Sequence, residues 1–435
     1  MVVGGSSAMV YADVGNAFTT ALRTFLFNFC FSNISTEVDF FRVSPTPTSS
    51  WSFLDHIFPM PRFIGTVRFA LLVSGILFSF GLSYYFGLRH GQSRTFQRDL
   101  VLVNAPKSGR VQADFERQDA MILGFNELIE HHPETLVQIV SAIQSRIQII
   151  GLVKTEEQRD RVNELLQSRG IAPDGISYFV WPAEIMWVRD YSPIFVVNGG
   201  VTMVDFDYRP ENGENTDFEN LFPVAFAARF NFPYTHSRLT LEGGNFVTNG
   251  EGICLSTTTM AAQNSSKRQL SLEEVAGKLG EYFRMNRWVY LESLVGDQVS
   301  HVDTFATFVS PDQVVVGAYD AEQSPENALI LDKNAEILSQ VSTPRGPLKV
   351  TRIRRPPNID GRFHTYTNVV FANGVLLVPQ YPTVSPELDR EAIRAYQALL
   401  PNWEIIGIDA TQLIRKRGAL HCVCAGVPRM PKNAQ

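Results

Sequence analysis

A repeated order of short apolar strands and amphipathic helices limits the possible folds of this chain more than any other feature. From about residue 99 the hydrophobic pattern reads as two strands, a helix and a third strand, again and again. Four such units occupy residues 193–241, 245–292, 304–353 and 367–408. A fifth is completed if residues 421–426 pair with 120–125. Because one unit cannot bury its apolar faces alone, the sequence predicts an α/β fold of five units in a ring.

An uncharged apolar segment, residues 69–88, precedes the repeats. Its length of about twenty residues suits the hydrocarbon core of a bilayer at ~1.5 Å per residue, so we expect a transmembrane helix at 66–88. A buried core helix is the alternative. Under the positive-inside rule, the flanking arginines favour a single-pass membrane protein with a cytoplasmic C-terminal domain. They are Arg62 and Arg68 on one side and Arg89, Arg94 and Arg98 on the other.

The apolar segment separates regions of the chain that differ in their hydrophobic pattern. Residues 1–65 show no sustained helical or strand period, so we expect a poorly structured N-terminal region there. Residues 89–110 read as a stalk or linker, and residues 111–430 hold the repeats. The oligomeric state is left open by the sequence.

Charge and cysteine content restrict the partners. A formal net charge of −6 and a pI near 5.8 provide no basic face for a phosphate backbone, which argues against nucleic acid and favours a cationic ligand. Four cysteines are too few and too scattered for a disulfide framework, so we expect free thiols.

Polar residues interrupt the apolar pattern at matching places in the five units, where each hairpin begins. In a ring of repeats, equivalent positions converge on the axis. One central pocket would therefore collect carboxylates, an imidazole, an amide and a thiol, namely Asp190, Glu242, His301, Asp303, Asn368 and Cys422.

These side chains together predict chemistry on a guanidino group. The carboxylates of Asp190 and Asp303 can each accept two N–H donors of a planar guanidinium. The bound cation favours the thiolate of Cys422, which can attack the guanidinium carbon. His301 would protonate the departing ammonia and then activate the hydrolytic water. Glu242 would orient His301, stabilise its charge, or contact the guanidinium itself.

Cys424 and a metal site are the competing interpretations near the C-terminus. Cys424 shares a strand face with Cys422, so it is either a second thiol near the site or an ordinary core residue. His421, Cys422 and Cys424 could also ligate a metal, but the chain has no second cluster with zinc-type spacing.

Five ordered motifs carry a family resemblance: "MWVRDYSPIF", "LEGGNF", "HVDTF", "TNVVFANGVLLVPQYP" and "GALHC". Over residues 111–428 the chain resembles the agmatine deiminase and Porphyromonas-type peptidylarginine deiminase family of guanidino-group modifying enzymes. The resemblance implies a five-bladed α/β propeller, the pentein fold, and no metal or other cofactor. It places the nucleophile at Cys422, the acid–base histidine at His301, the guanidinium-binding aspartates at Asp190 and Asp303, and the site asparagine at Asn368.

The remaining substrate contacts are expected around the same motifs. They are Trp187, Arg189, Arg209, Gly243 and Gly244, with the two glycines allowing a backbone turn close to the substrate.

Three stretches depart from the agmatine-specific pattern: "ILGFNE", "DYRPENGE" and "RGALHC". The second and third look closer to the peptidylarginine deiminase branch, but its second arginine is replaced by Glu211. Because the acidic loop at 205–217 would repel a free carboxylate, we expect free arginine to be a poor substrate.

Hydrolytic deimination of peptidyl-arginine, or of another carboxylate-blocked arginine, is accordingly the main functional prediction. Agmatine deimination to N-carbamoylputrescine, a step of putrescine biosynthesis, is the alternative. A non-catalytic, membrane-tethered module that binds guanidinium groups is a second alternative, which would leave the reactive Cys422 without a role.

Overall fold

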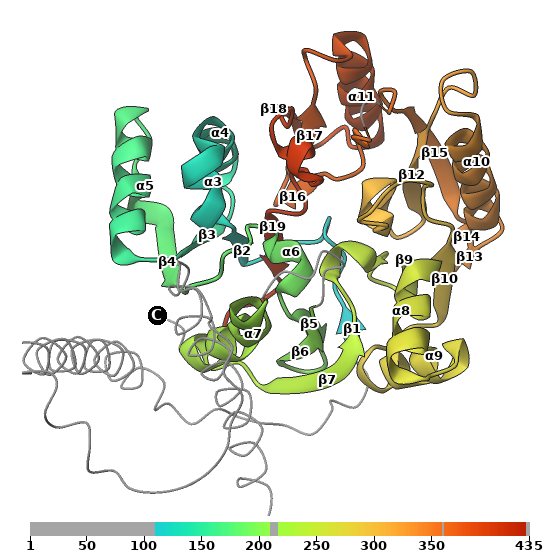
Figure 1. Ribbon diagram of the computed structural model, residues 1–435, viewed down its shortest axis with the longest axis horizontal. Coiled ribbons are helices and arrows are strands. Elements are labelled where there is room, and N and C mark those ends of the chain that lie inside the picture. The colour runs from blue at the N-terminus through green and yellow to red at the C-terminus, as the bar shows by residue number, and fades with distance from the viewer. Residues whose placement is uncertain (1–108, 209–215, 359–360, 432–435) are drawn as a thin grey trace, which may run out of the picture. The chain divides into compact units, whose positions relative to one another are not determined.

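The computed structural model describes residues 109–208, 216–358 and 361–431, drawn in colour in Figure 1. The predicted N-terminal region 1–65, the transmembrane helix 66–88, nearly all of the linker 89–110, and Arg209 lie outside the described residues. Within the part of the chain that is described, no helix combines the length and the apolar character needed to cross a membrane.

Five sheets share one topology, which confirms the predicted α/β class. In each sheet an antiparallel pair is followed by a third strand parallel to the second. The strands are β5 (Ile194–Val197), β6 (Val201–Asp207) and β7 (Tyr234–Thr240); β8 (Val247–Thr248), β9 (Ile253–Thr257) and β10 (Arg287–Leu291); β11 (Ala306–Ser310), β12 (Gln313–Ala318) and β15 (Lys349–Arg354); β16 (Val370–Ala372), β17 (Val375–Gln380) and β18 (Glu404–Asp409); and β19 (Cys424–Val427), β2 (Ala120–Leu123) and β3 (Gln148–Val153). The five units follow one another around a common centre (Figure 1).

Four short strands lie outside this plan. Two of them extend sheets, since β1 (Arg110–Val111) pairs with β5 and β4 (Ile176–Val180) pairs with β3. The other two, β13 (Ser342–Thr343) and β14 (Gly346–Pro347), form a separate hairpin.

Helices connect the second and third strands of each unit. They are α3 (Phe125–His131) and α4 (Pro133–Ile143), α7 (Asp217–Phe230), α8 (Thr258–Arg268) and α9 (Leu272–Tyr282), α10 (Pro325–Ser339), and α11 (Pro386–Leu399), while α5 (Glu156–Ser168) leads into β4. Helix α9 begins with a capping box between Ser271 and Glu274. The predictions missed α8, because its polar sequence buries only Met260, Ala261 and Asn264.

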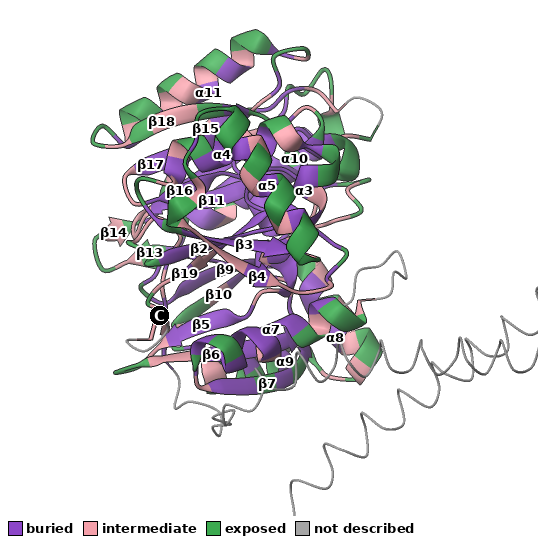
Figure 2. Ribbon diagram, turned by 90° about the vertical axis from the view of Figure 1, so that its left-hand side faces the viewer, coloured by how far each residue is buried: buried purple, intermediate pink, exposed green. Residues whose placement is uncertain are grey.

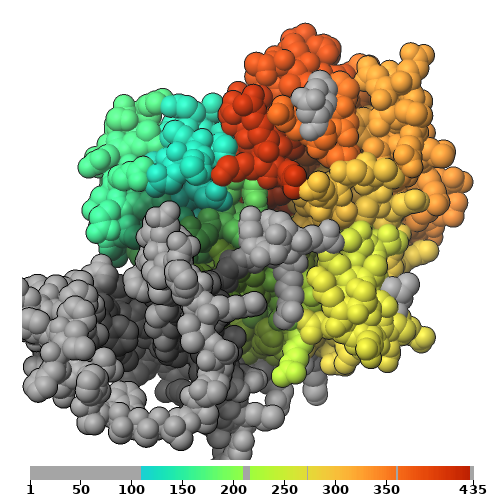
Figure 3. Space-filling view, in the orientation of Figure 1, coloured from blue at the N-terminus to red at the C-terminus, as the bar shows by residue number. Residues whose placement is uncertain are grey.

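Pairing between the two ends of the described chain closes the ring. Cys424 lies opposite Leu123 and Ala425 lies opposite Ile122 in an antiparallel ladder. The cyan and red segments accordingly lie side by side in the space-filling view (Figure 3). The predicted pairing of residues 421–426 with 120–125 is thereby confirmed.

The central strands, such as β2, β9, β16 and β17, form the buried interior, and the helices present their polar faces outward (Figure 2). Aromatic packing joins neighbouring units: Phe222 and Phe226 of α7 lie 5.5 and 5.8 Å, between ring centroids, from Phe179 of β4. Such pairs contribute about 0.5–1.5 kcal/mol beyond their buried area. The polar site residues lie on the turns that precede the hairpins, at the N-caps of 3-10 turns for Glu242 and His301.

Candidate active site

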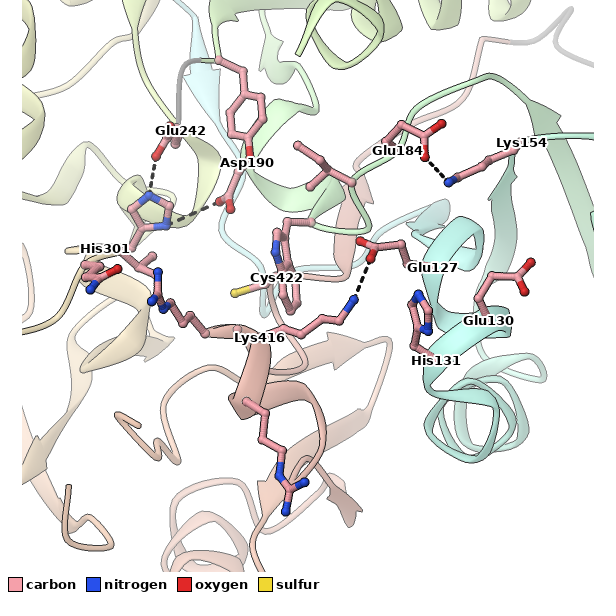
Figure 4. Close-up of a pocket in the computed structure, with 18 of the residues that line it drawn as sticks. Glu127, Glu130, His131, Lys154, Glu184, Asp190, Glu242, His301, Lys416 and Cys422 are labelled. Carbon is pink, nitrogen blue, oxygen red and sulfur yellow. Dashed lines mark hydrogen bonds and ion pairs between the residues drawn. The ribbon is translucent and has the colours of Figure 1, made fainter. Parts of the chain in front are cut away.

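One cavity of about 980 Å³ collects polar residues from separate units. Asp190 comes from the short helix α6 (Val188–Tyr191), Glu242 and His301 each precede a single 3-10 turn, and Cys422 lies just before β19. Figure 4 shows the sulfur of Cys422 and the side chains of Asp190 and His301 facing the same space. The structure thus brings together four of the five predicted catalytic residues at the cavity wall.

Each ring nitrogen of His301 lies near a carboxylate. Its Nε2 lies 2.6 Å from Oε2 of Glu242, and its Nδ1 lies 3.5 Å from Oδ1 of Asp190. Burial opposes a charge on the ring, but the negative charges of Asp190, Glu242 and Asp303 outweigh it and raise the pKa of His301 to about 10. The imidazole is therefore a proton donor at neutral pH.

The backbone before His301 is held in an unusual conformation. Ser300 has a φ of 57°, in the left-handed region, and its carbonyl accepts a 2.8 Å hydrogen bond from Oγ1 of Thr257. A non-glycine residue in this region costs on the order of 1 kcal/mol. The hydrogen bond from Thr257 at the end of β9 offsets that cost. It also holds the backbone from which the side chain of His301 projects.

Gly244 lies where the side chains converge. Its N–H donates a 3.0 Å hydrogen bond to Oδ1 of Asp190. A Cβ at this position would lie 2.6 Å from Nδ1 of His301, 2.8 Å from Oδ1 of Asp190 and 3.1 Å from Oδ2 of Asp303. Only glycine leaves room for all three. Burial raises the pKa of Asp190, and the charges of Glu242 and Asp303 add to this rise, although the charge of His301 and the hydrogen bond from Gly244 oppose it.

Cys422 is buried and close to Asn368. Its Sγ lies 3.6 Å from Oδ1 of Asn368, and that oxygen also accepts a 2.9 Å hydrogen bond from the N–H of His421. Burial, followed by the charges of Asp303 and Asp190, raises the pKa of the Cys422 thiol well above its ordinary value. Without a cation in the site, Cys422 is therefore a thiol at neutral pH.

Four buried polar atoms around Cys422 have no hydrogen-bond partner among the described residues. They are Oε1 of Glu242, Nδ1 of His301, Oδ1 of Asp303 and Nδ2 of Asn368. Unpartnered buried polar atoms are costly, and their clustering indicates a ligand that supplies the missing bonds. The two carboxylate oxygens can accept hydrogen bonds from a cation with N–H donors, whereas Nδ2 of Asn368 and the protonated Nδ1 of His301 are themselves donors and need an acceptor.

Some of the other predicted site residues lie on the cavity wall, and others lie in the layer beneath it. Trp187 lines the cavity, and its ring lies against Gly418, where a Cβ would come within 2.5 Å of the indole. Asp303 is 1% exposed and lies beneath the wall, beside Gly244. Asn368 lines a second cavity of about 310 Å³ that also reaches Cys422.

Arg189 and Gly243 lie behind the nucleophile rather than on the wall of the main cavity. Arg189 Nε donates a 2.9 Å hydrogen bond to the carbonyl of Cys424, and its backbone N–H donates to the carbonyl of Cys422. A Cβ on Gly243 would lie 2.1 Å from the carbonyl oxygen of Arg189. In this structure Arg189 holds the segment that carries Cys422, because its guanidinium donates to the carbonyl of Cys424 and to Asp114.

Sequence reasoning missed two groups of residues. His421 was weighed only as a metal ligand, yet its Nδ1 lies 2.8 Å from Oδ2 of Asp303. Charged residues from the segment 127–184 and from the C-terminal segment line the outer part of the main cavity, namely Glu127, Glu130, Lys154, Glu184, Arg415, Lys416 and Arg417. They fall in no motif, so only the fold reveals them. Among the described residues no cluster of three or more His, Cys, Asp or Glu side chains is arranged to hold a metal ion.

Comparisons with known proteins bear on this geometry. The model of the Porphyromonas-type peptidyl-arginine deiminase family matches residues 110–428. A protein assigned as an agmatine deiminase in Legionella pneumophila is 28% identical over 262 residues, which cover 58% of this chain and 74% of the relative. One with the same assignment in Listeria monocytogenes is 26% identical over 334 residues, which cover 68% and 88%.

Solved structures share the fold. The assigned arginine deiminase of Porphyromonas gingivalis is 25% identical, with a TM-score of 0.63 and coverage of 74% of this chain and 98% of that one. The agmatine deiminase of Enterococcus faecalis is 22% identical, with a TM-score of 0.67 and coverage of 76% and 99%. The second likeness supports the fold alone.

Proposed function

Because the chain belongs to the Porphyromonas-type peptidyl-arginine deiminase family and is a guanidino-group deiminase, we propose that it hydrolyses agmatine to a ureido product and ammonia. The observation that carries this proposal is the convergence of Cys422, the His301–Glu242 pair and buried carboxylates on one cavity. A guanidinium in that cavity would satisfy the unpartnered oxygen of Asp303 and lie beside Asp190.

The first half of the proposed reaction forms a covalent intermediate. The bound cation offsets the carboxylates that raise the pKa of Cys422, so the thiolate forms beside its target. Attack of the sulfur on the guanidinium carbon gives a neutral tetrahedral adduct. His301 then transfers its proton to one amino group, and the C–N bond to that group breaks. Ammonia departs, and a cationic amidino thioether remains on Cys422.

The second half releases the product. Neutral His301 takes a proton from a water molecule, whose oxygen adds to the same carbon. The C–S bond breaks, the thiolate of Cys422 departs, and loss of one proton leaves the ureido group. Glu242 stabilises the imidazolium form of His301 in both steps through the 2.6 Å contact.

Agmatine is favoured over other guanidino compounds by two observations. The curated relatives carry the agmatine deiminase assignment. In addition, the carboxylates of Glu127, Glu130 and Glu184 line the same cavity away from Cys422, where the ammonium group of agmatine could contact them. Lys416, Lys154 and Arg161 already pair with Glu127, Glu184 and Glu130, so the ammonium group would share these carboxylates with the protein's own cations.

A carboxylate-blocked arginine, as in a peptide, is the second candidate. The family description supports it, and a cavity of about 980 Å³ stands at the upper end of the roughly 300–1,000 Å³ that ligand sites occupy. The argument against free arginine rests on the loop around Arg209, which is outside the described residues.

Ammonia release from three compounds tests the proposal. We expect agmatine to give the highest kcat/KM, an acetylated arginine amide to follow, and free arginine to be poorest. A preference for the arginine amide would move the assignment to peptidyl-arginine, and a strong preference for free arginine would contradict the substrate argument. No ammonia from any of them would favour the non-catalytic guanidinium-binding module.

A further inference from the structure

A row of alternating charges runs from beneath the cavity to the opposite side of the nucleophile segment. Oδ2 of Asp303 lies 2.8 Å from Nδ1 of His421, whose Nε2 lies 3.4 Å from Oδ2 of Asp114. Oδ1 of Asp114 in turn lies 3.2 Å from Nη2 of Arg189. Anion, cation, anion and cation thus follow one another, and the Asp303 end is the one whose charge acts on the thiol of Cys422.

Both ring nitrogens of His421 face carboxylate oxygens, which favours the doubly protonated imidazolium form. Its ring is buried, with 7% of the side chain exposed, and burial together with Arg189 opposes a charge. The hydrogen bonds and charges of Asp114 and Asp303 outweigh both effects and raise the pKa of His421. Arg189 and His421 also hold the pKa of Asp114 well below its usual range, although partial burial of this carboxyl opposes the shift.

This arrangement divides the two oxygens of Asp303 between different tasks. Oδ2 accepts the hydrogen bond from His421, whereas Oδ1 is buried and has no partner among the described residues. A single rotation of the carboxylate would exchange them, and the bond to His421 opposes that rotation. The free oxygen is therefore held in one direction before the substrate arrives.

We propose that His421 is a positioning residue for Asp303, which it orients and keeps compatible with a buried negative charge so that Oδ1 can accept an N–H of the substrate. Asp114 and Arg189 supply the counter-charges that keep His421 in place. The inference rests on the proposed function in taking the substrate group to be a guanidinium. It gives the histidine that precedes the nucleophile a role separate from metal binding.

The far end of the row has access to solvent. Asp114 and Arg189 line a small cavity of about 60 Å³ that His421 does not line, and 29% of the Asp114 side chain is exposed. Water at that end can solvate Asp114 without entering the main cavity. The solvated carboxylate of Asp114 thus balances the charge on His421, while Asp303 at the other end of the row is buried.

Two substitutions of His421 separate the hydrogen bond from the ring. In His421→Asn the amide nitrogen takes the place of Nδ1 and can still donate to Asp303, whereas in His421→Gln it takes the place of Nε2 and cannot. We expect His421→Gln to raise the KM for agmatine about tenfold or more, as for loss of a hydrogen bond to a charged group, with a smaller change in kcat. His421→Asn should recover most of the KM.

His236→Gln provides the matched control. His236 makes a similar 2.9 Å contact with Asp205, on the sheet formed by β6 and β7, and it does not line the main cavity. Its KM should equal that of the wild type. Equal impairment of the two His421 variants, or an unchanged KM in His421→Gln, would overturn the positioning role.

A measurement independent of turnover keeps this inference separate from the proposed function. In full-length protein labelled with ¹⁵N-histidine, the signal lost in His421→Asn identifies the ring. We expect it to be an imidazolium at pH 7.5 in the wild type and to titrate at lower pH in Asp114→Asn. A neutral ring at pH 6 in the wild type would overturn the inference even if agmatine is turned over. If no guanidino compound is turned over, the proposed function fails while the titration still tests the charge row.

Discussion

Nε2 of His301 lies 2.6 Å from Oε2 of Glu242, although the two residues precede 3-10 turns in different units of the ring. Only 4% and 12% of their side chains are exposed, so the pair is shielded from water. Low local polarity strengthens a charge-assisted hydrogen bond of this kind. The pair is the structural basis for treating His301 as the proton donor.

Replacing Glu242 by glutamine should reduce turnover and shift its pH dependence. Glutamine keeps the shape but removes the charge that helps to raise the pKa of His301 to about 10. A lower pKa means less imidazolium at pH 8–9, so the alkaline decline of kcat should move to lower pH. We expect kcat at pH 8 to fall about 10²-fold, within the range for a positioned acid–base group.

Glu251→Gln is a suitable control for this experiment. Glu251 forms a surface pair with Arg345 and does not line the main cavity, so its pH profile should match the wild type. An alkaline limb that does not move in Glu242→Gln would show that Glu242 does not control His301.

Replacing each of the two neighbouring cysteines by serine should have very different effects on ammonia release. Cys422→Ser is expected to abolish ammonia release, because a serine hydroxyl is a much weaker nucleophile than a thiolate at neutral pH. Cys424→Ser should keep most of the activity, since Cys424 packs in the core beside β2, although burying a hydroxyl there can cost about 1–3 kcal/mol of stability. Steady-state assays with a thermal melt of each variant check this, and the opposite ranking would identify Cys424 as the nucleophile.

Alkylation of Cys422 should depend on pH and on a bound cation. Burial and two carboxylates raise the pKa of the thiol, so the reactive thiolate is scarce at neutral pH and increases as pH rises. We expect the rate with iodoacetamide, followed by peptide mass spectrometry, to increase throughout pH 7–10. Free guanidine should accelerate it at pH 7.5 by offsetting Asp190 and Asp303. A plateau below pH 8 without guanidine would contradict this account.

Alanine at position 244 should disable the site while leaving the fold intact. The added methyl group would lie 2.6 Å from His301 and 2.8 Å from Asp190, so at least one of these side chains must move. Because misplacement of reacting groups by about 1 Å can cost roughly 10²-fold, we expect kcat/KM to fall by that order. Gly277→Ala is the control: nothing lies within 4 Å of its Cβ, and alanine in helix α9 should stabilise the protein by about 0.5–1 kcal/mol. Normal kinetics in Gly244→Ala would show that the crowded turn is not needed.

Removal of residues 1–94 should give a soluble, active protein. Every proposed catalytic residue lies in the five-unit ring, and residues 69–88 carry the apolar segment for which we propose membrane anchoring. Fractionation of the full-length and shortened proteins, with ammonia assays of both, checks this. Failure of the shortened protein to fold would show that the N-terminal region belongs to the ring, and protease protection in sealed vesicles would report which side the ring faces.

The sequence was sufficient for the strand order because each hairpin is a short apolar run with a polar residue at its start. This pattern placed Asp190, Glu242, His301 and Cys422 at equivalent positions, and the ring brings them to one cavity. It also led to the β19–β2 pairing.

The sequence could not show the direction of individual side chains. Arg189 lies in a motif beside Asp190, yet a short helix turns it away from the main cavity toward the carbonyl of Cys424. Asp114 lies in a segment outside the repeat units, and its contact with His421 depends on ring closure. Such contacts join residues far apart in the chain, and no local periodicity encodes them.

Closure of the ring by β19 has a consequence for synthesis of the protein. Cys422 lies two residues before the strand that pairs with β2, so the fifth unit cannot be completed until translation has passed residue 427. Pairing of such distant segments is slow to form because a long loop must close first. A nascent chain can therefore assemble four units without a nucleophile, and deiminase chemistry becomes available only when the last strand leaves the ribosome.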